Sequence, residues 1–216
     1  MSYVTYMDDT FDQALITSAF TLAAESGWAS VSVAAAARAA GLPLEQARAR
    51  FVGRDAILLR FGRWADQAAL TGVTEDGSPR DRLFDMLMRR FDALQSHREG
   101  LRALMRALPS DPGTAVLLGA STRASMAWML GAAGLRTGGL AGMLRTKGLV
   151  AVWLYALRAW ERDDSADLSG TMAALDRALG RAEQFGTWLE GGGAPDGPKP
   201  FPDYPPDEAG EAANSI

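Results

Sequence analysis

Three arginines, Arg48, Arg50 and Arg54, lie close together in the segment AAGLPLEQARARFVGRD, residues 39–55. Residues 38–63 hold six arginines against two acids, a local charge of +4 in a chain whose net charge is −4. Guanidinium groups neutralise phosphates and donate hydrogen bonds to phosphate oxygens and to guanine. Arginines also simply solvate an exposed helix. Residue types alone leave nucleic-acid contact and surface solvation equally open.

Residues suited to other chemistry are scarce. The chain has no cysteine and one histidine, His97, which excludes disulfides, thiolate chemistry and a histidine-based metal or acid/base cluster. His97 stands beside Arg98 and Glu99 and is expected on the surface. Asp163 and Asp164 are typical of a solvated turn that ends a helix, and the segment GLRTGGLAG lacks the strand that precedes a phosphate-binding loop. We therefore expect no catalytic residue, metal or cofactor, and a protein that is not an enzyme.

Apolar residues at helical spacing indicate an all-α fold. The first helix has its apolar face from Phe11 onward and ends at Gly27. Two short helices follow, one capped by a serine and ending at Gly41, the other beginning near Pro43. Gly53 separates them from a longer amphipathic helix. Further helices are expected at about residues 80–95, 98–108, 112–133, 140–163 and 168–189.

Composition divides the chain into three parts. Residues 72–79, GVTEDGSP, form a small polar boundary closed by proline. We expect a first domain at residues 1–71 and a second at 80–189. Residues 190–216 hold six of the ten prolines and a net charge of −5, which predicts a disordered acidic tail. No signal peptide or uniformly apolar run of bilayer length is evident, so a cytoplasmic protein with no membrane contact is expected.

Two short helices joined by a glycine-containing turn form the skeleton of a helix-turn-helix. Their order adds to the signal: an apolar helix ending in Gly27 and Trp28, the segment VSVAAAARAAGL, a short helix, then FVGRD and a long helix. In this order, residues 11–70 resemble the TetR/AcrR family of transcriptional regulators. The resemblance implies an N-terminal three-helix DNA-binding unit, a larger helical domain that binds a ligand and dimerises, and double-stranded operator DNA as partner.

The recognition helix that the resemblance implies is unusual. Pro43, Leu44 and Glu45 replace the small residue, lysine and glycine of the family pattern, and Arg48 replaces its tyrosine. Phe51 is expected in the core. A leucine suits a thymine methyl group, a glutamine suits adenine, and an arginine suits guanine or phosphate. The residues expected to contact DNA are Ser32, Pro43, Leu44, Gln46, Arg48, Arg50 and Arg54.

The second region is rich in large, adaptable apolar side chains. Methionine and tryptophan line apolar ligand pockets well, although they fill ordinary cores equally well. The resemblance implies a small apolar effector, for which the candidate contacts are Met105, Met126, Trp128, Met129, Trp153 and Tyr155. The last two long helices are the expected surface of a homodimer. A repressor of this kind would release DNA when the effector binds.

An alternative is a lipid-binding protein on the same scaffold. The segment LRTKGLVAVWLYALRAWERDDSADLSGTMAALDRAL, residues 144–179, is similar to part of the coenzyme Q biosynthesis accessory family, which binds isoprenoid lipids. The unusual start of the recognition helix agrees with a loss of DNA binding. That family ends in an amphipathic membrane helix, whereas this sequence ends in a polar, proline-rich segment.

Overall fold

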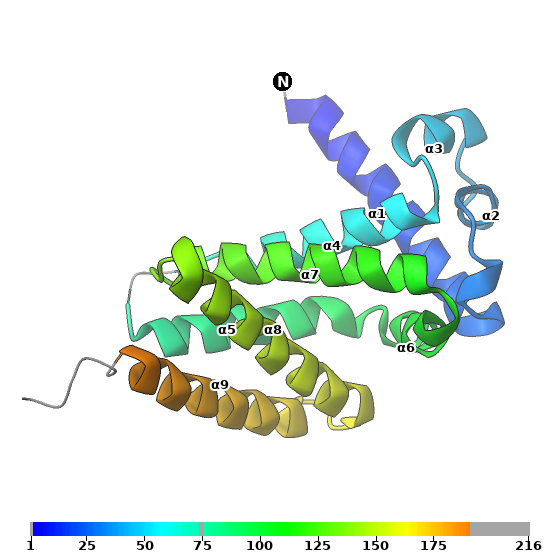
Figure 1. The fold of residues 1–216 in the computed structure, drawn as a ribbon. Coiled ribbons are helices and arrows are strands. Elements are labelled where there is room, and N and C mark those ends of the chain that lie inside the picture. The colour runs from blue at the N-terminus through cyan, green and yellow to red at the C-terminus, as the bar shows by residue number, and fades with distance from the viewer. Residues whose placement is uncertain (1, 74–75, 191–216) are drawn as a thin grey trace, which may run out of the picture.

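The computed structural model describes residues 2–73 and 76–190, with side chains described for residues 10–73 and 76–184. These segments are helical and contain no strand (Figure 1). The all-α fold predicted from the sequence is confirmed. The α-helices are α1 (Ser2–Ser26), α2 (Val33–Ala39), α3 (Leu44–Arg50), α4 (Arg54–Leu70), α5 (Pro79–Gln95), α6 (Arg98–Ala107), α7 (Pro112–Ala132), α8 (Gly139–Arg162) and α9 (Ser169–Glu190).

Local sequence signals set most of these boundaries. The five helices expected after residue 79 begin and end within one residue of their predicted bounds. In contrast, α1 begins at Ser2, well before Phe11. This earlier start could not be predicted, because residues 2–10 carry no apolar periodicity that would indicate a helix. Two short 3-10 helices, Trp28–Ser30 and Leu108–Ser110, were not predicted. The tail at residues 191–216 lies outside the described residues.

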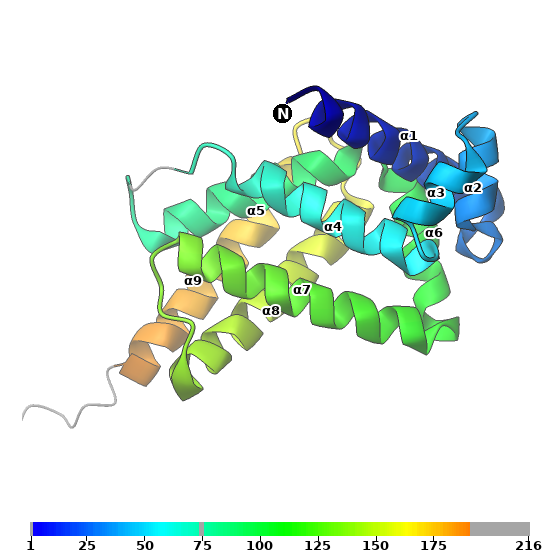
Figure 2. The same cartoon turned by 90° about the horizontal axis from the view of Figure 1, so that it is seen from above.

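Helices α1 to α4 form the N-terminal unit. Ser32 caps α2, with its hydroxyl oxygen accepting a hydrogen bond from Ala35 N at 3.1 Å. Gly41 has φ +65°, a conformation that glycine adopts easily, and so turns the chain from α2 towards α3. Phe51, 1% exposed, closes α3 onto the core, as predicted. Figures 1 and 2 show α2 and α3 together at one end of the molecule.

Helices α5 to α9 form the rest of the described chain. Ser78 and Asp81 make a reciprocal capping box at the start of α5, and Asp111 caps α7 by accepting from Thr114 N at 3.1 Å. Helices α8 and α9 pack along each other (Figure 1). Arg98 and Arg102 of α6 donate to the backbone carbonyls of Trp160 and Glu161, in the last turn of α8.

One of the contacts between the N-terminal unit and the remaining helices is that of α1 with α6. Gly100 of α6 lies so close to α1 that a Cβ atom there would be 2.3 Å from the carbonyl oxygen of Phe20. No side chain fits at that distance without moving the backbone. Gly100 therefore sets how closely the two helices approach.

We predict that Gly100→Ala lowers the stability of the protein by about 1–3 kcal/mol, because the added methyl group forces α1 away from α6. Thermal unfolding followed by circular dichroism would measure the loss as a lower Tm. Gly119→Ala in α7 is the matched control, because a Cβ atom at Gly119 meets nothing within 4 Å. That variant should be neutral or stabilising, since alanine favours helix. Equal Tm values for the two variants would contradict the prediction.

Candidate nucleic-acid interface

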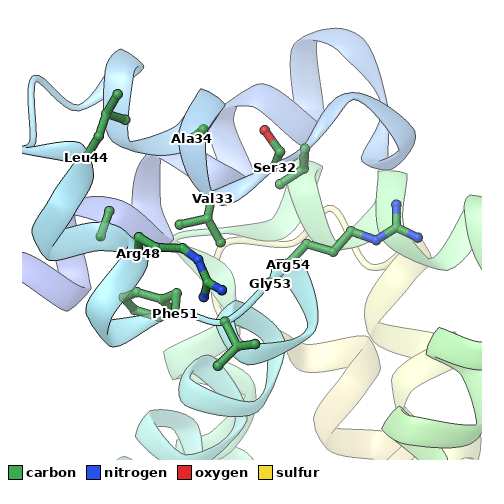
Figure 3. Close-up of a pocket in the computed structure, with 11 residues that line it drawn as sticks. Ser32, Val33, Ala34, Leu44, Arg48, Phe51, Gly53 and Arg54 are labelled. Atoms are coloured by element: carbon green, nitrogen blue, oxygen red, sulfur yellow. The ribbon is translucent and has the colours of Figure 1, made fainter.

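A shallow hollow of about 440 Å³ lies between the start of α2, helix α3 and the start of α4. Its floor is apolar, and two arginines stand at its edge (Figure 3). In Figure 3 the guanidinium of Arg48 lies over the hollow, whereas that of Arg54 extends away from it. The lining residues are Val31, Ser32, Val33, Ala34, Leu44, Ala47, Arg48, Phe51, Val52, Gly53 and Arg54.

Most residues predicted to contact DNA are exposed around this hollow. Arg48 is exposed and makes no hydrogen bond or ion pair with any residue that the structure describes. Leu44, 45% exposed, stands at the start of α3, one turn before Arg48. Ser32, Pro43 and Gln46 are also exposed. A positive group and an apolar group therefore share one outer face of α3.

Arg50 points instead into the protein. Its Nε donates to Oδ1 of Asp12 at 2.7 Å, and its guanidinium lies 5.3 Å from the ring centre of Phe11. Arg60 of α4 approaches the other oxygen of Asp12 at 3.0 Å. Asp12 is 4% exposed, so two positive groups surround a buried carboxylate. Sequence reasoning missed Asp12, although an acid at an apolar position of α1, three residues before Leu15, was a usable signal.

Arg54 connects the N-terminal unit to α7. Its Nη2 donates to Oδ2 of Asp111 at 2.5 Å, and both side chains are partly exposed. Asp111 is the residue that caps α7. Hydrogen bonds from Thr114 and the positive charge of Arg54 lower the pKa of Asp111 below its ordinary value. The first residue of α4 is thereby tied to the first turn of α7.

His97 lies in an aromatic cluster between α1, α4 and α6, which corrects the expectation of a surface residue. Its ring stacks on Phe20 at 5.3 Å and meets the edge of Phe61 at 5.3 Å, with Trp64 at 6.1 Å. The charged neighbours Arg98 and Glu99 hid this packing in the sequence. Burial lowers the pKa of His97 below 6.5, because an imidazolium loses its hydration there.

The structure separates the six side chains predicted to bind an effector. Met126, Met129 and Trp153 are buried in the core, at 0, 0 and 4% exposure. Met105 is partly buried. Trp128 and Tyr155 are 73% and 46% exposed, so in a single chain they face outward. The six therefore do not line one enclosed pocket.

Comparison with known proteins supports the fold. Neither a protein-family model nor a curated protein matches the sequence. Among solved structures, a TetR transcriptional regulator from Nitrosomonas europaea superposes with a TM-score of 0.66 at 21% identity, covering 81% of this chain and 98% of that one. A TetR-family regulator from Streptomyces coelicolor gives 0.57 at 20% identity, covering 88% and 92%. One from Rhodococcus sp. RHA1 gives 0.55 at 19% identity, covering 78% and 93%.

These similarities place the molecule in a structural class of helical proteins with an N-terminal helix-turn-helix. The chain has the fold of TetR-family transcriptional regulators, as its N-terminal motif predicted.

The environment of His97 predicts a pH-dependent stability. The lowered pKa means that the unfolded chain binds a proton more readily than the folded one, so stability is complete above the unfolded pKa of about 6.5 and falls below it. We expect the free energy of unfolding to decrease from about pH 7.5 to about pH 5.5 more steeply in the wild type than in His97→Phe. Urea unfolding at several pH values would measure both slopes. Identical slopes would show that His97 does not contribute.

Proposed function

We propose that the protein is a one-component transcriptional regulator, most simply a repressor, that binds operator DNA as a homodimer and is released by a small ligand. The observation that carries this proposal is the contrast among the arginines near α3. Arg50 and Arg54 are held by carboxylates, whereas Arg48 is exposed over the hollow without a partner among the described residues. An arginine held ready in this way suits a phosphate or a guanine.

Each exposed residue has a role in this proposal. Arg48 binds phosphate or guanine, Gln46 pairs with adenine, and Leu44 contacts a thymine methyl group. Ser32 and Pro43 stand where α2 and α3 begin, so their backbone lies beside the positive ends of these helices. Arg50 and Arg54, which the sequence also assigned to DNA, serve here as positioning residues for α3 and α4.

A second copy of the chain is needed to bind a complete operator. A single helix-turn-helix covers too few base pairs for a specific site, and a palindrome needs two. Helix α8 offers an apolar face: Leu140, Met143, Leu144, Leu154 and Tyr155 are 43–69% exposed along one side of it. By length and composition alone, α8 could also cross a bilayer, and these apolar side chains contribute to that composition. One such helix is weak evidence for a membrane span. We assign this apolar face to the homodimer.

Release of DNA follows from an equilibrium between two spacings of the recognition helices. A ligand that binds better to the spacing that does not match the half-sites shifts the protein towards it. No chemical step is required. The coupling free energy between ligand and DNA is set by the difference between the free energies with which the ligand binds the two states.

We predict that Arg48→Ala weakens binding to the DNA immediately upstream of its own gene by about tenfold. Because one phosphate contact is lost, the slope of the logarithm of the binding constant against the logarithm of the salt concentration should fall in magnitude by about one per subunit. Fluorescence anisotropy at two salt concentrations, with nonspecific duplex as competitor, would measure both. Arg136→Ala is the control, because Arg136 is exposed in the loop between α7 and α8. The end of α7 that leads into this loop lies away from α3 (Figure 1). Binding that competitor DNA erases in the wild type would instead favour the lipid-binding alternative.

We also predict that Leu154→Arg converts the dimer to monomers, because the charge would be buried without a partner in the α8 interface. Sedimentation velocity would give the mass of each species. Val52→Arg is the matched control, because Val52 is 82% exposed but lies just after α3. It should leave the mass unchanged, and a Leu154→Arg variant that also remains dimeric would exclude this face as the interface.

A further inference from the structure

A buried ion pair lies inside the helical bundle at the meeting point of α4, α5, α7 and α8. Asp66 of α4 contacts Arg90 of α5, with 2.8 Å between Oδ1 and Nη1. Ser125 of α7 donates to the other oxygen of Asp66 at 2.6 Å. The guanidinium of Arg90 lies 4.8 Å from the ring centre of Trp153 of α8. Nothing in the spacing of these four residues along the chain connects them.

The pair is incompletely satisfied. Arg90 is 6% exposed, yet neither its Nε nor its Nη1 makes a hydrogen bond, and neither does Oδ1 of Asp66. The 2.8 Å contact is therefore close but poorly aligned. Buried polar groups in a structural core are normally fully hydrogen-bonded. An arginine cannot lose its charge to relieve the mismatch, so Arg90 holds unused donors in an apolar surrounding.

The surroundings of Arg90 favour one kind of ligand. Buried apolar side chains, Met86, Leu87, Met126 and Met129, lie on the helices that carry the pair, and Phe91 stacks on Trp153 at 4.5 Å. A single guanidinium matches a single negative charge, and its planar fork can accept a carboxylate through two parallel bonds. The side chain of Asp66 is 21% exposed and that of Arg90 is 8% exposed, so Asp66 is the side that solvent reaches.

We propose that Arg90 is the anchor of a binding site for the carboxylate of an apolar organic acid, which enters past Asp66 and replaces it. Arg90 keeps one negative partner throughout, and the acid's apolar part packs among the methionines and Trp153. Asp66 then turns towards solvent. The site is closed by Asp66 in this structure, and displacement of that side chain opens it.

The exchange reaches DNA through α4, a step that rests on the proposed function. Asp66 ties α4 to α5 through Arg90 and to α7 through Ser125, and the same helix begins at Arg54 beside the recognition unit. A carboxylate that displaces Asp66 removes both ties at once. Of these two polar ties between α4 and α7, only the one at the first residue of α4, Arg54 to Asp111, then remains, which favours a different placement of α3.

Calorimetry with the full chain tests the site directly. The probes are straight-chain carboxylates from acetate to decanoate, each paired with the alcohol of the same length. We expect the affinity to rise with the length of the carbon chain. At each length the acid should bind more tightly than its alcohol, by a factor of about ten or more. Arg90→Gln should abolish that preference. Arg89→Gln, one residue away and bonded to Thr71 O at the surface, should preserve it.

Asp66→Asn separates a binding role from a structural one. It removes the competing charge but keeps a group that can bond to Ser125, so acids should bind several-fold more tightly than in the wild type. This outcome is informative even if Arg90→Gln fails to fold. Equal binding of acid and alcohol, or binding of neither, in both the wild type and Asp66→Asn would overturn the site.

The two proposals fail in different ways. Anisotropy with operator DNA, with and without decanoate, measures the coupling separately. Binding that needs Arg90 but leaves DNA affinity unchanged would support the site and overturn its coupling to DNA. Absence of specific DNA binding, together with acid binding that needs Arg90, would support the site while removing the transcriptional proposal.

Discussion

The position of the proposed DNA-binding helix α3 depends on the ion pairs of one buried carboxylate, that of Asp12. Helix α3 has only seven residues, too few to be stable alone in water, so its position must come from tertiary contacts. Asp12 supplies the polar ones by joining α1 to Arg50 of α3 and Arg60 of α4, beside the apolar contacts of Ala47 and Phe51. Removing an arginine would leave the buried carboxylate less compensated, which destabilises this end of the protein. The triad therefore fixes α3 relative to α1 and α4, and leaves the outer face of α3, with Arg48, open.

Helix α4 extends this constraint through the molecule. It begins next to α3, carries Arg60 to Asp12, and continues between α5 and α7, where Asp66 meets Arg90. Its contacts with both parts include ion pairs, in addition to buried apolar side chains such as Ile57 and Ala65. The α1–α6 joint is a steric contact at Gly100 and an aromatic cluster around His97, which α4 also joins through Phe61. A close steric contact acts as a fixed point, while ion pairs can exchange partners. Of the polar contacts of α4, the pair at Asp66 is therefore the one that a ligand could exchange under the proposed site at Arg90.

The helices could be predicted because periodicity, glycines and caps are local signals. The buried charges could not, because their partners lie far away along the chain. Asp12 and Arg90 occupy positions in the apolar phase of α1 and α5, as the buried residues one turn away, Leu15 and Met86, show. A charge in such a phase indicates burial but does not identify the partner. His97 was misplaced for the same reason: its sequence neighbours are charged, whereas its spatial neighbours are aromatic. The expected contacts of the effector were chosen by residue type, which does not distinguish the exposed Trp128 from the buried Trp153.

An exchange of partners at Arg90, as proposed above, changes the free energy of the protein only slightly. The penalty for burying the guanidinium is already present before any ligand binds, so an incoming carboxylate need not desolvate a new cation. The free-energy change depends on the difference between two similar ion pairs, plus the gain from returning Asp66 to water. Differences of this kind fall in the range of about 1–3 kcal/mol that is typical of coupling between sites. A fully satisfied pair would resist exchange, whereas the poor alignment between Arg90 and Asp66 leaves room for a better partner.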